Sequence, residues 1–361
     1  MRAPLKTPLS RAATRLAAAL AVLLPGCGGG GSPSAPGTPP PTTVPAEQFG
    51  VSALLYYDEN RNNVLDESES VRLADVELEV AGRIGRTGRD GRVTVEGVPR
   101  GTHPAVIRAA SLPPFFAGGA PVTIEAPQSA EARVPVALPI GPNRPYTYLC
   151  SGDSISQGNG SRDGRGYRAI LEAKLEAHFA GSVTTTYRGG GGGTSAAGAA
   201  RIVRDLQQNE PAYTLIAWGT NDWVECGDEV AGCFTIANLR SIVRDVKAAE
   251  SLPCLATLIP VNAGFDERVP PRRNEWVSRT NEQVRALARE EGALLVDVHA
   301  AFQRSADLSS LFSDHVHPND DGYDVVATAF FDALTRPRGS GSGAVAAGAP
   351  PSFGFARLSA R

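Results

Sequence analysis

One stretch decides the fold of this 361-residue chain: Tyr148-Leu149-Cys150-Ser151-Gly152-Asp153-Ser154-Ile155. Its apolar half predicts a buried strand, and Gly-Asp-Ser predicts the turn that follows. A serine just beyond a buried strand is held by a rigid scaffold and still reaches solvent, which suits a nucleophile. Small polar residues after a strand usually form only a turn, so the motif needs partners elsewhere in the chain.

Beyond this stretch, strand-like and helix-like segments alternate, which predicts one domain over residues 145–336. Repeated β-α units indicate a parallel sheet with helices on both faces, and such sheets bind ligands beyond the carboxyl ends of their strands. Ser154 follows one of these ends. The expected strands are 146–150, 183–187, 213–218, 254–259 and 294–297, and the expected helices are 167–179, 196–208, 238–250, 276–291 and 321–334.

Five consecutive glycines separate the second of these strands from its helix, in Arg188-Gly189-Gly190-Gly191-Gly192-Gly193-Thr194-Ser195. Glycines at a helix start expose backbone N–H groups and let a ligand approach the main chain. A phosphate-binding loop is the competing interpretation. However, no Lys-Ser or Lys-Thr pair follows the glycines, and no acidic residue completes a dinucleotide fingerprint. The run alone is equally compatible with a flexible turn.

Two later segments carry the groups that a serine nucleophile needs. Asn221 follows an apolar strand and can aim its amide N–H at a developing negative charge, while Asp222 and Trp223 are expected to shape that loop. Asp314 precedes His317 by three residues, so its carboxylate can orient the imidazole as a base. Among the other histidines, His315 is the rival base, His299 beside Asp297 is a weaker one, and His103 and His178 lie in unsuitable contexts.

Over about 146–334, four segments of the chain resemble, in order, the four blocks of the GDSL, or SGNH, hydrolases. They are Gly152-Asp153-Ser154, the glycine run, Gly219-Thr220-Asn221-Asp222, and Asp314 to His317-Pro318. This resemblance implies a flavodoxin-like α/β three-layer sandwich that hydrolyses esters without a catalytic cofactor. Ser154 would be the nucleophile, His317 the general base and then acid, and Asp314 the orienting residue. The oxyanion hole would combine the Ser154 N–H, the Asn221 side chain and one glycine N–H. Gly192 fits the spacing best if Gly189 takes the family's earlier glycine, and Gly191 is the rival.

Residues 49–140 carry short alternating strands separated by turns, which predict a small β-sandwich with strands at 51–57, 76–80, 93–95, 105–107 and 132–138. The turn after the first strand has oxygen ligands at alternate positions, as a calcium loop does. Asn63 stands where such loops have glycine, and asparagine tolerates the left-handed conformation. A solvated acidic turn is the alternative. Positions one, three, five, seven, nine and twelve are Asp58, Asn60, Asn62, Val64 (through its carbonyl), Asp66 and Glu69.

This turn, with Arg89-Asp90-Gly91-Arg92-Val93 and Val98-Pro99-Arg100-Gly101 after it, resembles the B-type repeats of bacterial surface adhesins and related carboxypeptidase-regulatory-like sandwiches. The resemblance implies a spacer or binding module stiffened by structural Ca2+, without a catalytic role.

The first 27 residues are expected to be a lipoprotein signal peptide, with basic residues before the apolar run 16–24. The run ends in Leu24-Pro25-Gly26-Cys27, which resembles a lipobox whose Cys27 is lipidated. Because Pro25 is unusual there, an ordinary cleaved secretory signal is the alternative. Residues 28–48 are a Gly/Pro-rich linker, and residues 337–361 are expected to be a disordered tail.

An exported chain can keep disulfides, and Cys226 and Cys233 flank a short loop just beyond Asn221, where a bond would stiffen the rim of the site. Cys150 and Cys254 lie on apolar strands and are expected to be buried thiols. The composition, with 20% charged residues and a net charge of -3, gives no electrostatic footprint for nucleic acid.

Together these features predict a serine esterase of the cell envelope, exported and held by a lipid anchor in the outer membrane, in the periplasm or at the cell surface. Its substrates would be short acyl or O-acetyl esters, including those on polysaccharide. Alternatives are a lysophospholipase or thioesterase type of acylhydrolase, and an O-acyltransferase. A different class is a glycan-binding or adhesion lipoprotein with an inactive hydrolase domain. The sequence leaves the oligomeric state open.

Overall fold

The structure is a computed structural model that describes residues 46–265 and 269–338. The expected signal peptide with Cys27, the linker as far as residue 45 and the tail from residue 339 lie outside the described residues. The described residues from Ala46 onward belong to one compact unit. Within them, no helix is both long and apolar enough to cross a membrane.

Two four-stranded sheets form the N-terminal part of the described chain. Side chains alternate between buried and exposed along β4, where Val93 and Val95 are buried and their neighbours face solvent, as the period of a strand requires. The predicted β-rich region is therefore confirmed, and its classification as a sandwich stays a prediction. The first sheet has the order β4 (Arg92–Pro99), β1 (Gln48–Tyr57), β8 (Ala132–Ala137), β6 (Ala117–Gly118), and the second β3 (Arg83–Arg86), β2 (Glu77–Val80), β5 (Gly101–Ile107), β7 (Val122–Ala126).

A five-stranded parallel sheet forms the rest of the described chain. Counted from the first strand of this sheet, the order is second, first, third, fourth, fifth, which is the flavodoxin-like arrangement. The predicted α/β fold is therefore confirmed. The strands in spatial order are β10 (Thr184–Gly189), β9 (Arg144–Gly152), β11 (Pro211–Ala217), β12 (Leu252–Ala256) and β13 (Leu294–Val296).

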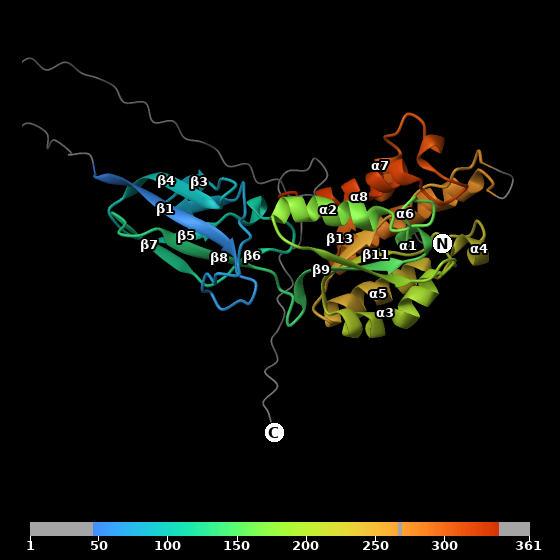
Figure 1. The fold of residues 1–361 in the computed structure, drawn as a ribbon, viewed down its shortest axis with the longest axis horizontal. Helices are drawn as coiled ribbons and strands as arrows, with labels where there is room; N and C mark the ends of the chain where they lie inside the picture. The colour runs from blue at the N-terminus through green and yellow to red at the C-terminus, as the bar shows by residue number, and fades with distance from the viewer. Residues whose placement is uncertain (1–45, 266–268, 339–361) are drawn as a thin grey trace, which may run out of the picture. The chain divides into compact units, whose positions relative to one another are not determined.

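Helices cover both faces of this sheet (Figure 1). On one face α2 and α8 pack against each other, and on the other face α3 packs against α5, which also contacts α6. The longer helices are α2 (Tyr167–Phe179), α3 (Ser195–Asn209), α5 (Thr235–Ala248), α6 (Arg272–Glu291) and α8 (Asp320–Thr335), and the short ones are α1 (Ser154–Gln157), α4 (Trp223–Cys226) and α7 (Val298–Phe302).

The expected strand 254–259 ends earlier, at Ala256. Beyond Ala256 the chain stays buried, but its backbone groups form hydrogen bonds with side chains of α6. Asn281 Oδ1 accepts from the Leu258 N–H at 2.8 Å, and Asn274 Oδ1 accepts from the Val261 N–H at 2.8 Å. The apolar sequence therefore continues past the end of the strand, where asparagine side chains of α6 become the hydrogen-bond partners of the backbone.

The predicted domain boundary near residue 140 is packed. Ile140 is buried, and Asn143 Nδ2 donates to the Ala249 carbonyl at 2.8 Å. The Tyr57 and Tyr146 rings meet edge to face with centroids 5.7 Å apart, and the Tyr146 hydroxyl donates to Glu59 at 2.7 Å. Both parts contribute side chains to one apolar cluster.

Candidate active site

Ser154 lies at the carboxyl end of β9, the second strand of the sheet by position, flanked by β10 and β11. It is the first residue of α1, so the predicted turn after the strand is the start of a short helix. Asp153 caps this helix by accepting the Ile155 N–H at 2.9 Å. Gly152 is required because a Cβ there would lie 2.1 Å from Ser156 Oγ and 2.7 Å from the Ala217 carbonyl oxygen.

Ser154, His317 and Asp314 form a continuous chain of hydrogen bonds. His317 Nε2 lies 2.9 Å from Ser154 Oγ, and His317 Nδ1 lies 2.7 Å from Asp314 Oδ2. The other carboxylate oxygen of Asp314 accepts the backbone N–H groups of Val316 at 2.8 Å and of His317 at 2.7 Å. This is the geometry in which an imidazole removes a proton from a serine hydroxyl.

The electrostatics of Asp314 suit an orienting carboxylate. Partial burial raises its pKa, but the hydrogen bonds from the His317 ring and the two backbone N–H groups outweigh burial and hold the pKa below its usual value. Asp314 therefore remains ionised near neutral pH and stabilises the tautomer of His317 that has its proton on Nδ1.

The segment after Ser154 packs directly against the segment that carries His317. Gly160 has a φ of 95°, and a Cβ there would lie 2.3 Å from the Pro318 carbonyl oxygen and 2.4 Å from Ser313 Oγ. The Tyr323 hydroxyl, on α8, donates to the Asn159 carbonyl at 2.6 Å. These contacts fix the distance between the nucleophile and the base.

In the described part of the chain, the Ser154 hydroxyl is hydrogen-bonded to His317 and to no other histidine. His315 Nδ1 is 3.9 Å from Asp314 Oδ1 and has no hydrogen-bond partner. Asp297, the neighbour of His299, is paired with Arg285 at 2.8 Å. His103 contacts the Pro99 carbonyl at 2.8 Å, and His178 packs against aromatic rings.

Asn221 lies between the glycine run and Asp153. Its Nδ2 donates to the Gly193 carbonyl at 3.0 Å and is 3.4 Å from Asp153 Oδ2. The second contact is long for a hydrogen bond, so the amide has one N–H that is fixed and one that is held loosely.

The two candidate glycines differ in their surroundings. Gly192 has a φ of 71°, and no heavy atom lies within 4 Å of a Cβ placed on it. A Cβ on Gly191 would lie 3.9 Å from Ser154 Cβ and 3.5 Å from Gln157 Oε1. A Cβ on Gly191, the rival, would therefore come within 4 Å of the nucleophile, whereas the left-handed turn falls on Gly192.

Asp153 is a buried carboxyl group, although its position between Gly152 and Ser154 in the sequence indicates only a turn residue. Burial raises its pKa to about 7, and the Ile155 N–H and His317 oppose that effect, while Asp222 adds to it. The only sequence signal for this group is its place between a glycine and the nucleophile.

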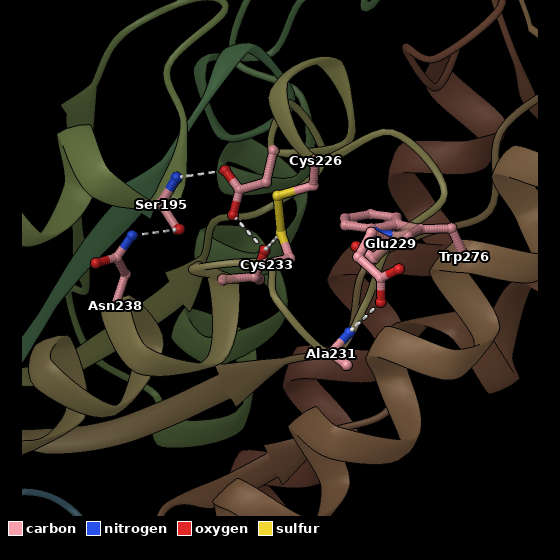
Figure 2. The surroundings of a disulfide bond; sticks show 9 residues. Ser195, Cys226, Glu229, Ala231, Cys233, Asn238 and Trp276 are labelled. Carbon is pink, nitrogen blue, oxygen red and sulfur yellow. Dashed lines mark hydrogen bonds between the residues drawn. A yellow bond between two sulfur atoms is a disulfide. The ribbon is translucent and has the colours of Figure 1, made fainter.

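Cys226 and Cys233 form a disulfide, with Cα atoms 5.5 Å apart, across the loop that follows Asn221 (Figure 2). Cys150 and Cys254 are free and buried, and burial raises the pKa of the Cys150 thiol to about 12. These two thiols are therefore protonated near neutral pH.

The loop from Asp58 to Glu69 gathers its oxygen atoms inward. Asp58 and Glu69 are buried, with 1% and 2% of their surfaces exposed. Asp66 Oδ2 accepts from the amides of Asn60 at 2.7 Å and Asn62 at 2.9 Å. Among the described residues, no three His, Cys, Asp or Glu side chains are grouped closely enough to hold a metal ion by themselves. A cation here would also need amide and backbone oxygens.

Residues 150–325 match the family model of the GDSL-like Lipase/Acylhydrolase family. This segment contains Ser154, Asn221, Asp314 and His317. No curated protein matches the chain in sequence.

Solved structures resemble about half of the chain. An acetylxylan esterase from Geobacillus stearothermophilus is 25% identical over 52% of this chain and 93% of its own, with a TM-score of 0.44. An α/β hydrolase enzyme from the metagenome of Lake Arreo, Spain, is 25% identical over 52% and 94%, with a TM-score of 0.42. A GDSL-like lipase from Bacteroides thetaiotaomicron is 20% identical over 52% and 87%, with a TM-score of 0.41.

Proposed function

We propose that this chain cleaves short-acyl carboxylic esters with Ser154, His317 and Asp314. Its residues 150–325 match the GDSL-like lipase/acylhydrolase family, and the chain is an ester-hydrolysing serine hydrolase. The observation that carries the proposal is the chain of hydrogen bonds from Asp314 through His317 to Ser154, at 2.7 and 2.9 Å.

The reaction follows from this geometry. His317 Nε2 takes the hydroxyl proton as Ser154 Oγ attacks the ester carbonyl, and Asp314 stabilises the imidazolium that forms. The Ser154 N–H, Asn221 and a glycine N–H stabilise the oxyanion. The imidazolium then protonates the departing alcohol. Water, deprotonated by His317, releases the acid from Ser154.

The preference for short acyl and O-acetyl esters rests on the predicted export and on the β-rich N-terminal part, which favour O-acyl groups on polysaccharide outside the cytoplasm as substrates. Lysophospholipase, thioesterase and O-acyltransferase activity remain the alternatives within the same chemistry. The continuous triad favours an active enzyme over an adhesion protein with an inactive domain.

The test is turnover of 4-nitrophenyl esters from acetyl to octanoyl by the wild type and by Ser154→Ala. The proposal expects the highest kcat/KM for the shortest acyl groups and loss of turnover in the variant. Equal turnover by Ser154→Ala contradicts it. Acetate release from acetylated polysaccharide then distinguishes a glycan deacetylase from a lipid or thioester acylhydrolase, and ester formation with an added sugar identifies a transferase.

The Asp58–Glu69 loop is proposed as a structural Ca2+ site. Two buried carboxylates without a cationic partner among the described residues are costly, and a hard cation would compensate them. The ligands would be Asp58, Asn60, Asn62, the Val64 carbonyl, Asp66 and Glu69. The left-handed conformation of Asn63, with a φ of 62°, supplies the turn that glycine makes in such loops. Calcium should raise the melting temperature of the wild type and not of Glu69→Gln, and an equal effect on both contradicts the site.

Export and a lipid anchor at Cys27 are proposed from the N-terminal sequence. The enzyme would then act at the cell envelope on esters outside the cytoplasm. Metabolic labelling with a lipid precursor should mark the wild type and not Cys27→Ala, and equal labelling would refute the anchor.

A further inference from the structure

Asp222 is a fully buried carboxylate, with 0% of its surface exposed, directly after Asn221. Within the described part of the chain, no lysine, arginine or histidine forms an ion pair with it. Its oxygens instead accept the Ser195 N–H at 2.7 Å and the Thr235 hydroxyl at 2.6 Å. Because a buried charge without a cation is costly, these two donors must carry its stabilisation.

Both donors stand at helix starts. Ser195 is the first residue of α3 and Thr235 is the first residue of α5, and these helices have 15 and 14 residues. The positive ends of both helix dipoles therefore favour the Asp222 charge. Asn238, on α5, also donates to Ser195 Oγ at 3.0 Å, which holds the two helix starts together (Figure 2).

This arrangement connects two sides of the oxyanion hole. Ser195 lies two residues after the glycine run, and Asp222 follows the amide that would bind the oxyanion. Asn221 in turn donates to the Gly193 carbonyl at 3.0 Å. A change in the position of the Asp222 carboxylate would therefore move the glycine N–H groups and the Asn221 amide relative to Ser154.

The disulfide contacts this group of Asp222, Ser195 and Thr235, which is called the anchor from here on. Cys233 Sγ lies 3.2 Å from Thr235 Oγ1, and the Cys226 N–H donates to the Asp222 carbonyl at 2.9 Å. A disulfide sulfur carries no proton, so the single hydroxyl proton of Thr235 is directed to Asp222. After reduction, Cys233 would carry an S–H that can donate to the same hydroxyl oxygen, and the 226–233 loop would lose its cross-link.

We propose that Asp222 is the positioning residue of the oxyanion hole, and that the Cys226–Cys233 disulfide is a redox-sensitive clamp on it. The inference rests on the proposed esterase activity. A dithiol reductant would break the S–S bond, deliver two electrons and two protons to the two cysteines and become a disulfide itself. Turnover would then fall while substrate binding is retained.

The first experiment compares Thr235→Val, which removes the hydroxyl at nearly constant volume, with Thr235→Ser, which keeps it. We expect kcat on 4-nitrophenyl acetate to fall about tenfold in Thr235→Val with little change in KM, and to be largely retained in Thr235→Ser. The matched control is Thr214→Val, which removes the buried hydroxyl that contacts Ser251 at 2.8 Å. It should lower the melting temperature and leave kcat unchanged. A kcat of Thr235→Val equal to that of the wild type overturns the proposal.

The second experiment treats the wild type and Cys226→Ser/Cys233→Ser with dithiothreitol, with thiol titration to verify that the bond has opened. The wild type should lose kcat on reduction and regain it on reoxidation, and the double variant should not respond. A fully reduced wild type with unchanged kcat overturns the clamp.

Hydrogen exchange gives a readout that needs no substrate. The amides of 188–195 should exchange faster in Thr235→Val and in the reduced wild type than in Thr214→Val. Unchanged exchange contradicts the anchor even where esters are hydrolysed. Faster exchange in a protein that hydrolyses no ester would leave the anchor in place and remove the proposed function instead.

Discussion

His317 Nε2 lies 2.9 Å from Ser154 Oγ, although 163 positions separate the two residues in the chain. The parallel sheet makes this possible because Ser154 follows β9 in the interior of the sheet and His317 immediately precedes α8, which packs on α2. The close approach of the backbone at Gly160 to the segment 313–318, which leaves no room for a Cβ, then sets the final distance. The site is therefore assembled by the topology, and its precision comes from one loop-to-loop contact.

Replacement of Asp314 by asparagine tests the orienting role. An amide cannot fix the His317 tautomer that leaves Nε2 free to accept the serine proton, so kcat should fall by about 10³–10⁴. KM should change little because Asp314 does not touch the substrate. The control is Asp307→Asn, an exposed residue whose carboxylate accepts from Ser309. Steady-state kinetics on 4-nitrophenyl acetate measure both, and an equal small effect of the two changes contradicts the role.

Asn221→Ala tests the oxyanion donor. Removal of one such donor costs about 10²–10³ in kcat, because the lost interaction exists mainly in the transition state. Substrate binding should be nearly unchanged. A large rise in KM with retained kcat would instead make Asn221 a ground-state binding residue.

Gly160→Ala tests the contact between the two loops, and Gly164→Ala is its matched control. Both glycines have positive φ values, 95° and 67°, so both substitutions carry backbone strain of about 1 kcal/mol. Only the Gly160 substitution places a Cβ against Pro318 and Ser313, since no heavy atom lies within 4 Å of a Cβ placed on Gly164. Gly160→Ala should therefore lower both kcat and the melting temperature, and Gly164→Ala only the melting temperature. Similar kcat values in the two variants would show that the contact does not set the site.

Much of the α/β fold could be predicted because its signals are local. The predicted helix 167–179 coincides with α2, whose buried Leu171 and Leu175 are one turn apart. The helix α6 begins at Arg272, before the expected 276, because Pro271 caps it and its first turn is polar. In the N-terminal part, β3 was not predicted, because this strand is mostly exposed and lacks the alternation that marks a half-buried strand.

The residues of the candidate site also fall into those with a local sequence signal and those without one. Ser154, Asn221, Asp314 and His317 stand in short motifs, so the sequence could select them. Asp222 could be selected only as a residue that shapes a loop, since its partners Ser195 and Thr235 lie on two other helices. The state of Asp153 depends on how completely the fold removes it from water, and no pattern in the sequence reports that.

The raised pKa of Asp153 predicts how stability changes with pH. Burial makes the charged form unfavourable in the folded state and raises the pKa to about 7, whereas an unfolded aspartate has a pKa of about 3.9. The folded state therefore binds the proton of Asp153 more tightly than the unfolded state does. The stability gained from this proton is complete below the unfolded pKa and is lost as pH rises to about 7. Asp153→Asn removes this titration, because an amide stays neutral.

The measurement is the urea midpoint of the wild type and of Asp153→Asn between pH 4.5 and pH 8, a range chosen as roughly the window between the two pKa values. The wild type should lose stability relative to the variant as pH rises through this range, by about 1.4 kcal/mol for each unit of pKa difference, and the gap should become constant above it. The control Asp90→Asn changes an exposed turn residue, so its gap to the wild type should stay nearly constant with pH. A gap for Asp153→Asn that is also constant would mean that Asp153 is already ionised at pH 4.5 and that its carboxylate is stabilised by more than the Ile155 N–H and His317.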